Sequence, residues 1–142
     1  MNNALLVAQY IIHICNERNI PITHLKLQKL LYFVQANFLF NTRQPCFNDK
    51  IIALPYGPVV ESVFNHFRMR GVGASNLVDE ETFDINNLQH IELIDETLDE
   101  LANFDAFQLV DITHKQSPWR NAFNHATGSE ITSTAIRDYF DE

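Results

Sequence analysis

The hydrophobic positions of the chain recur with a helical period over most of its length. Apolar residues spaced by three or four positions predict helices at about residues 2–18, 24–41, 58–70, 88–102 and 106–115, with shorter helices from Trp119 and near the C-terminus. Thr23 and Asp105 are suited to cap the second and the fifth of these helices, because their side-chain oxygens can accept hydrogen bonds from free backbone amides. Ser133 or Thr134 can cap the last one.

Residues 46–54 interrupt this helical pattern. A polar stretch at 48–50 separates two short apolar runs and predicts a β-hairpin near residues 46–54. Tyr56-Gly57-Pro58 then predicts a tight connection into the next helix, with Pro58 in the first turn, where its missing N–H would have no partner anyway. The sequence therefore predicts a mainly α fold, a compact single domain over residues 1–142 with about six to seven helices and one short hairpin.

The helix at 24–41 is apolar on two sides, which predicts a central place in the fold. One stripe holds Leu27, Leu30, Leu31, Val34 and Phe38, and the other holds Leu25, Tyr32 and Leu39. Gln28 and Gln35 fall between the stripes, so we expect them to be partly buried and to need hydrogen-bond partners. Lys26, Lys29 and Asn37 lie on the remaining side and are predicted to point away from both stripes.

The composition is that of a globular protein. Hydrophobic residues make up 46% of the 142 residues and include eleven phenylalanines, which is ample material for a core. Two cysteines form no disulfide framework and suggest a reducing compartment. The N-terminus lacks the basic and small-residue features of a signal peptide, and no apolar run approaches the ~18 residues of a membrane span. We therefore expect a cytoplasmic protein without membrane contact.

Charge is distributed unevenly along the chain. Residues 1–78 hold seven basic and three acidic side chains, whereas residues 79–142 hold three basic and fifteen acidic ones. This distribution argues against nucleic-acid binding, which requires a clustered basic surface. Much of the acidity falls on the helix at 88–102, which is predicted to be an outer helix. Its Asp95, Glu96 and Asp99 could simply provide solubility, or they could steer a basic protein partner.

Signatures of catalysis and of metal binding are weak. The six histidines and two cysteines show no C-x-x-C or H-x-x-x-H spacing, and neither a nucleophile elbow nor a phosphate-binding glycine loop occurs. Acidic residues at 79–84 and 92–100 could hold metals, but acidic runs on one helix are more typical of a solvated face. We predict no metal, no cofactor and no enzymatic activity.

The only tryptophan, Trp119, follows a helix-starting Pro118 and lies near His114. In one interpretation Trp119 anchors the core at a helix junction and His114 caps a carbonyl group. In the other, Trp119 is an exposed aromatic anchor for a protein partner, because tryptophan is enriched at binding hot spots.

Four segments, taken in order, resemble the family of Panacea-domain, or SocA-like, antitoxins, which includes phage-associated GepA-like proteins. The segments are residues 25–32, the Tyr-Gly-Pro turn at 56–60, Thr113-His114 with Pro118-Trp119, and Ile136 with Tyr139-Phe140. Family members often carry an aromatic residue before the Tyr-Gly-Pro turn, where this chain has Leu54-Pro55, which is expected to alter the local surface. The motif residues, expected to be scaffold, are Leu27, Gln28, Lys29, Tyr32, Tyr56, Gly57, Pro58, Val59, Thr113, His114, Pro118, Trp119, Tyr139 and Phe140.

The resemblance implies a mostly helical protein that binds and neutralises a cognate toxin encoded by an adjacent gene. The expected partner is thus a protein, with self-association left open, and the partner-binding candidates are Asp95, Glu96, Asp99 and Trp119. Alternatives are an adaptor that delivers its partner to a protease, or an orphan phage-associated interaction protein. A further alternative is an enzyme of unrecognised type whose polar pocket between helices is lined by His24, Gln28, Gln35 and His114.

Overall fold

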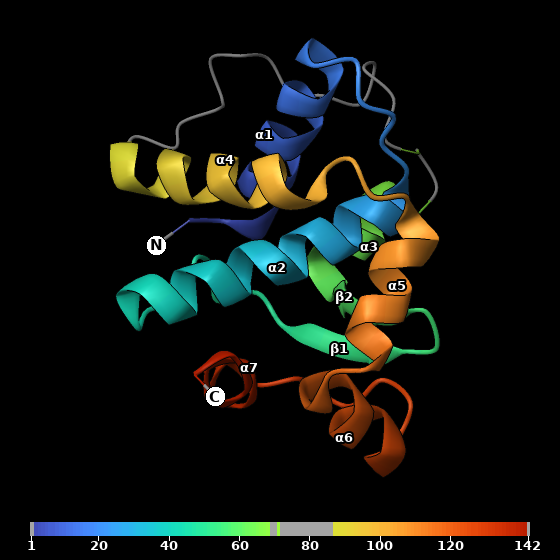
Figure 1. The fold of residues 1–142 in the computed structure, drawn as a ribbon. Helices are drawn as coiled ribbons and strands as arrows, with labels where there is room; N and C mark the ends of the chain where they lie inside the picture. The colour runs from blue at the N-terminus through green and yellow to red at the C-terminus, as the bar shows by residue number, and fades with distance from the viewer. Residues whose placement is uncertain (1, 69–70, 72–86, 142) are drawn as a thin grey trace.

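The computed structural model describes residues 2–68, 71 and 87–141, in which seven helices surround one two-stranded sheet (Figure 1). The order is α1 (Ala4–Glu17), α2 (His24–Thr42), β1 (Ile51–Leu54), β2 (Gly57–Val60), α3 (Glu61–Phe67), α4 (Leu88–Leu101), α5 (Ala106–His114), α6 (Ser117–His125) and α7 (Ser133–Phe140). The predicted mainly α fold with a small hairpin is confirmed.

Helix α2 lies at the centre of the molecule, as its two apolar stripes predicted. It packs against α1, α3, α4, α5, α7 and β2, and Figure 1 shows it between α4 on one side and the hairpin on the other. Thr23 caps it, accepting a hydrogen bond from the backbone N–H of Lys26 at 3.2 Å. Because neighbours surround the helix, its third side is covered as well, with Lys29 0% and Lys26 6% exposed. The prediction that these lysines point outward is therefore wrong.

The hairpin lies further along the chain than its predicted position. Strand β1 pairs antiparallel with β2, with Leu54 opposite Gly57, and residues 55–56 form the turn. Pro58, predicted in the first turn of a helix, lies in β2 instead, and α3 begins at Glu61. A proline fits this strand because β2 has an edge on which no ladder N–H is required. Gly57 has φ +103°, which a helix cannot accommodate.

The remaining helices agree with the sequence pattern. Asp105 caps α5 and forms a capping box with Gln108, while α6 carries Pro118 in its first turn. The N-cap of α7 is Thr132, one residue before the predicted position. The acidic residues at 79–84 lie outside the described residues, as does nearly all of the stretch 71–87 between the helices predicted at 58–70 and 88–102. No helix in the described part of the chain combines the length and the hydrophobicity that a membrane span requires.

Candidate functional site

Three of the four family-like motifs, distant in sequence, meet at the β1–β2 hairpin, whereas the fourth, with Tyr139 and Phe140, lies on α7. Two of their side chains hold the turn of the hairpin by its backbone. The indole Nε1 of Trp119, on α6, donates a hydrogen bond to the carbonyl oxygen of Leu54 at 2.8 Å. The imidazole Nε2 of His114, at the end of α5, lies 2.9 Å from the carbonyl oxygen of Pro55. Since a carbonyl only accepts, Nε2 of His114 is the protonated nitrogen of this ring.

Two further motif side chains, both from α2, hold the outer edge of β2. The backbone N–H of Val60 donates to Oε1 of Gln28 at 2.8 Å, and Nζ of Lys29 donates to the carbonyl oxygen of Pro58 at 2.9 Å. These side-chain atoms occupy the places that the carbonyl and amide of a third strand would take. Pro58 has no N–H to satisfy, so the edge of β2 is closed by α2 without another strand.

The outer edge of β1 is closed by the chain between α6 and α7. The N–H of Ala53 donates to the carbonyl of Ser129 at 2.9 Å, and the N–H of Gly128 donates to the carbonyl of Ala53 at 2.7 Å. The N–H of Ile131 donates to the carbonyl of Ile51 at 2.8 Å. The short sheet is therefore bounded by α2 on one side and by residues 128–131 on the other, and its turn is held by α5 and α6.

Lys29 is the most unusual member of this cluster. Its side chain is fully buried, and burial lowers the pKa of its ammonium group to about 7. Gly57 makes room for it: a Cβ atom at position 57 would lie 2.8 Å from Cε of Lys29 and 2.9 Å from Oγ1 of Thr113. A glycine is thus required at position 57 for two reasons. Its φ is positive, and the side chain of Lys29 lies too close to leave room for a Cβ atom.

Other buried polar side chains of α2 also form hydrogen bonds within the protein. Gln35 receives the backbone N–H of Cys46 at 2.8 Å and donates to the carbonyl of Phe47 at 2.8 Å. The hydroxyl of Tyr32 donates to Oε1 of Gln116 at 2.7 Å, and burial raises the pKa of Tyr32. The prediction that Gln28 and Gln35 are buried with partners is confirmed, and those partners are mainly backbone groups of residues 46–60.

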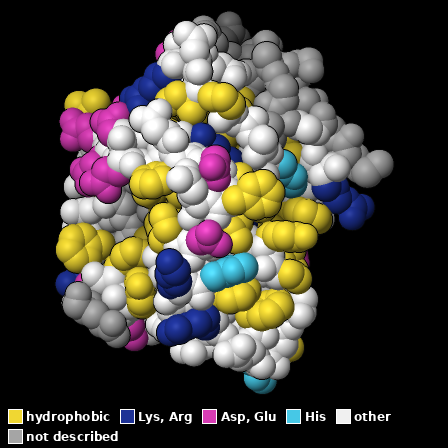
Figure 2. All heavy atoms as spheres, turned by 45° about the vertical axis from the view of Figure 1, so that its right-hand side comes forward, with side chains coloured by type: hydrophobic (Ala, Val, Ile, Leu, Met, Phe, Trp, Pro, Cys, Tyr) yellow, Lys and Arg dark blue, Asp and Glu magenta, His cyan; other side chains and the backbone are white. Residues whose placement is uncertain are grey.

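An aromatic face lies over this cluster. Tyr56, at the tip of the hairpin, is 63% exposed, and Phe107 and Phe104, beside α5, are 68% and 38% exposed. At the C-terminal end of α5, His114 stacks on Trp119 of α6, which stacks on Phe123, with ring centroids 4.0 and 4.8 Å apart. Figure 2 brings the α5 side forward and shows hydrophobic side chains gathered on this face, with single charged side chains among them. We call this surface, defined by Tyr56, Phe104, Phe107, Trp119 and Phe123, the aromatic face.

An apolar pocket opens beside Tyr56. Its volume is about 210 Å³, and its lining consists of His24, Leu25, Gln28, Leu54, Tyr56, Val59 and Phe64. The two polar side chains in it are paired with each other, since Nε2 of His24 lies 3.0 Å from Nε2 of Gln28. Burial lowers the pKa of His24, which favours the neutral ring that this contact with an amide nitrogen requires. The pocket suits an apolar side chain.

The four polar side chains suggested as an enzyme pocket do not line this pocket together. His24 and Gln28 lie in it, whereas Gln35 faces residues 46–47 and His114 holds the turn at Pro55. Among the described residues no three His, Cys, Asp or Glu side chains gather as metal ligands would.

The partner-binding candidates fall on two separate surfaces. Trp119 is half-buried within the aromatic face, so it is both packed against the core and partly accessible. Asp95 and Asp99 lie on α4 and contact α1: Asp95 accepts a hydrogen bond from the hydroxyl of Tyr10 at 2.7 Å, and Asp99 pairs with Arg18 at 2.9 Å. Glu96 is exposed on the same helix. Figure 1 places α4 and α6 at opposite ends of the molecule.

Sequence reasoning did not single out Phe107. It lies on α5, whose buried residues Leu109, Val110 and Thr113 define the inward side. Phe107 falls on the opposite side beside Gln108 and Asp111, both exposed. A large aromatic residue among polar neighbours on a helix was the signal that could have marked it.

The chain matches the sequence model of a protein family described as "Antitoxin SocA-like, Panacea domain" over residues 27–120, about two thirds of its length. It is also similar to Antitoxin SocA of Caulobacter vibrioides (strain NA1000 / CB15N), with 36% identity over 69 residues. That alignment covers 49% of this chain and 37% of the relative, so the chain spans little more than a third of the relative's length in this match. No solved structure matches the chain.

Proposed function

This chain belongs to the family of SocA-like antitoxins with a Panacea domain, and from that premise we propose that it is an antitoxin that acts by direct binding. Its partner is a cognate protein toxin encoded by an adjacent gene. In this proposal the protein works without catalysis, metal or cofactor, and a protein surface does the neutralising. The observation that carries the proposal is the aromatic face, which lies over the residues matched by the family.

The aromatic face has the properties of a protein-binding surface. Three of its side chains, Tyr56, Phe104 and Phe107, are large, apolar and between 38% and 68% exposed, which a monomeric protein does not need for its own folding. Tyrosine and tryptophan are also enriched at binding hot spots. The hairpin that carries Tyr56 is held by backbone hydrogen bonds from Trp119 and His114, so it is ordered before binding. A preorganised surface loses less entropy on association.

In this proposal most of the motif residues are scaffold. The polar atoms of Gln28, Lys29 and His114 that bind the hairpin backbone are used within the protein. Their role is to fix residues 54–60 against α2, α5 and α6. The toxin then contacts side chains displayed on this support, among them Trp119, and those side chains can differ between members that bind different toxins.

The acidic side of α4 has a separate role in the proposal. Asp95, Glu96 and Asp99 give that side of the molecule a negative field. Such a field steers a basic partner and raises the rate of association. We expect the association rate with the toxin to fall markedly as salt is added.

The test is expression of the neighbouring gene with and without this protein. A toxin should stop growth when it is expressed alone, and co-expression of this protein should restore growth. Phe107→Ala should weaken the rescue, whereas Leu88→Ala, at an apolar residue 69% exposed on α4, should leave it intact. The proposal fails if no neighbouring product is toxic, or if a toxic product neither binds this protein nor is rescued by it. The half-life of the toxin in rescued cells separates sequestration from delivery to a protease.

A further inference from the structure

A second surface lies along the C-terminal half of α2. It is a groove of about 260 Å³ between α2, α4 and α7, lined largely by Phe33, Ala36, Phe40, Leu101 and Phe140. Phe40 is 52% exposed, so one wall of the groove is an aromatic ring open to solvent. The groove runs between helices, which is the usual setting for an added amphipathic helix.

The polar groups in the floor of the groove are already satisfied. Nδ2 of Asn37 donates to the carbonyl of Leu93 at 3.0 Å and to Oγ1 of Thr97 at 3.2 Å. Oδ1 of Asn37 accepts a hydrogen bond from Nδ2 of Asn41 at 2.7 Å, and the hydroxyl of Thr97 donates to Leu93 at 3.0 Å. A ligand therefore finds no free donor or acceptor in these side chains and must fill the groove with apolar groups.

The rim of the groove differs from its floor. Glu100 lines the groove, and Glu96 lies one helical turn before it on the same side of α4. Both carboxylates are exposed, and among the described residues neither has a cationic partner. This separates them from Asp95 and Asp99, which face α1 and contact Tyr10 and Arg18.

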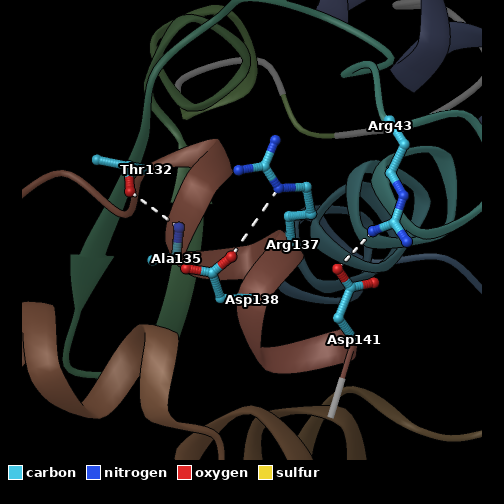
Figure 3. A network of polar contacts seen from close by, with 6 residues as sticks. All are labelled: Arg43, Thr132, Ala135, Arg137, Asp138 and Asp141. Carbon is cyan, nitrogen blue, oxygen red and sulfur yellow. Dashed lines mark hydrogen bonds and ion pairs between the residues drawn. The ribbon is translucent and has the colours of Figure 1, made fainter.

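Two arginines on or next to the helices that border the groove, both outside its lining, are already paired with carboxylates. Arg43, which follows α2, pairs with Asp141, and Arg137 on α7 lies 3.9 Å from Asp138 (Figure 3). Each pair is neutral, so the groove keeps the uncompensated negative charge of Glu96 and Glu100 on the α4 side. An apolar floor and a negative rim together define the chemistry of the complementary partner.

We propose that this groove binds an amphipathic, basic helical segment of the partner protein. Apolar side chains on one side of that segment fill the space between Phe40, Leu101 and Phe140, and a lysine or arginine one turn away pairs with Glu100. The inference rests on the proposed function in one respect, namely that the segment belongs to the toxin. The groove is then a second contact, distinct from the aromatic face.

The first test uses a model peptide and does not require the toxin. The peptide has about four helical turns, with leucines at positions i, i+3, i+4 and i+7 and lysines elsewhere. On titration into the 15N-labelled protein, we expect the amide resonances of Phe40, Leu101 and Phe140 to shift. A matched peptide with glutamates in place of the lysines should cause much smaller shifts. Equal binding of the two peptides, or shifts confined to another surface, would overturn the inference.

Three variants sharpen the test. Phe40→Ala and Glu100→Arg should each weaken binding of the lysine peptide at least about tenfold. The first removes an apolar wall of the groove, and the second reverses a negative charge on its rim. Glu61→Arg is the matched control, because it makes the same charge change at an exposed position on α3, which does not border the groove; it should change the affinity by less than about threefold. All three positions are exposed, so thermal unfolding should confirm that the variants fold. Wild-type affinity in Phe40→Ala and Glu100→Arg would contradict the proposal.

The second test measures binding of the toxin itself. If the toxin is neutralised and Glu100→Arg weakens its binding about tenfold, the groove is a contact site for it. If neutralisation holds but Phe40→Ala and Glu100→Arg bind the toxin as the wild type does, the groove inference fails and the antitoxin function stands. If no toxin exists but the peptide binds as described, the antitoxin proposal fails and the groove still binds basic helices. Concentration-dependent shifts of the same resonances without peptide would instead assign the groove to a second copy of this chain.

Discussion

The β1–β2 hairpin and helix α4 use their polar groups in opposite ways. At the hairpin, buried side chains from α2 and half-buried ones from α5 and α6 bind the backbone of residues 54–60, so each local contact depends on residues far away in sequence. On α4, the acidic side chains lie at or near the surface, and Asp95 and Asp99 each make one contact, with Tyr10 and Arg18.

Because of this difference, we expect the hairpin region to tolerate substitutions less well than α4 does. A buried donor or acceptor that loses its partner destabilises the fold by about 1–3 kcal/mol, whereas an exposed ion pair contributes about 0–1 kcal/mol. The hairpin region is therefore constrained by folding, and α4 is free to change its charge. A binding protein that must follow a changing partner can vary α4 without endangering its own structure.

The largest effect is expected at Gly57. Gly57→Ala should lower the free energy of unfolding by about 3 kcal/mol or more, because backbone strain at φ +103° and the contact of the new Cβ with Lys29 and Thr113 add together. Gly128→Ala is the control, since φ there is +86° but no atom lies within 4 Å of the new Cβ. Denaturant unfolding measures both. Equal losses in the two variants would show that Lys29 and Thr113 do not limit the space at Gly57.

The buried Lys29 should make stability depend on pH. Its pKa in the folded protein is about 7, against an ordinary value of 10.5 in the unfolded chain, so between these values the unfolded chain binds a proton that the folded one does not. The free energy of unfolding should therefore rise with pH in this interval. From pH 7 to pH 9 the rise due to Lys29 is about 2 kcal/mol.

Lys29→Met isolates this contribution. The variant keeps a long apolar side chain and loses the titrating group, and subtracting its profile from that of the wild type cancels the contributions of the other groups, including the two cysteines. Urea unfolding at pH 7, 8 and 9 gives the profiles. Parallel profiles for wild type and variant would mean that the ammonium is not desolvated as its burial indicates.

A smaller effect is expected at Trp119. Trp119→Phe keeps an aromatic ring in the stack between His114 and Phe123 but removes the indole N–H that binds the carbonyl of Leu54. We expect a loss of about 1 kcal/mol in the free energy of unfolding, the ordinary contribution of one hydrogen bond. Thermal and denaturant unfolding of the variant and of the wild type measure this loss in stability. No loss at all would indicate that the turn is held without this bond.

The smallest effect is expected on α4. Asp99→Ala removes an ion pair with Arg18 in which the two side chains are 66% and 38% exposed, so the free energy of unfolding should change by less than about 0.5 kcal/mol. The same unfolding measurement applies, at low salt, where the ion pair is strongest. A loss as large as that of Trp119→Phe would remove the contrast between the two regions.

Much of the fold could be predicted because helical periodicity is a local property of the sequence. The two stripes of α2 predicted its central place, and the buried Gln28 and Gln35 could be inferred from their position between the stripes. The burial of Lys29 could not be inferred in this way, because a helical wheel does not show that the hairpin covers that side of α2. A lysine is ordinarily assigned to solvent since burying its charge is costly, and here a lowered pKa and the carbonyl of Pro58 offset that cost.

The site was predictable in part for the same reason. The motif residues were identified in sequence, but the meeting point of those from α2, α5 and α6, the backbone of residues 54–60, is visible only in three dimensions. The hairpin was expected too early because the polar residues 48–50 imitate a turn, whereas the real turn at 55–56 depends on Gly57 and on its contact with Lys29. The groove between α2, α4 and α7 arises from the packing of helices that are distant in sequence, so no local pattern of residues predicts it.

The closed edges of the small sheet have a consequence for the behaviour of the protein in concentrated solution. A short strand with free amide and carbonyl groups is a template on which other chains can add, and this leads to fibres and to exchanged dimers. Here α2 occupies one edge through Gln28 and Lys29, and residues 128–131 occupy the other. The sheet therefore offers no template for aggregation, and exposed aromatic side chains can be displayed beside it without inviting strand-to-strand assembly.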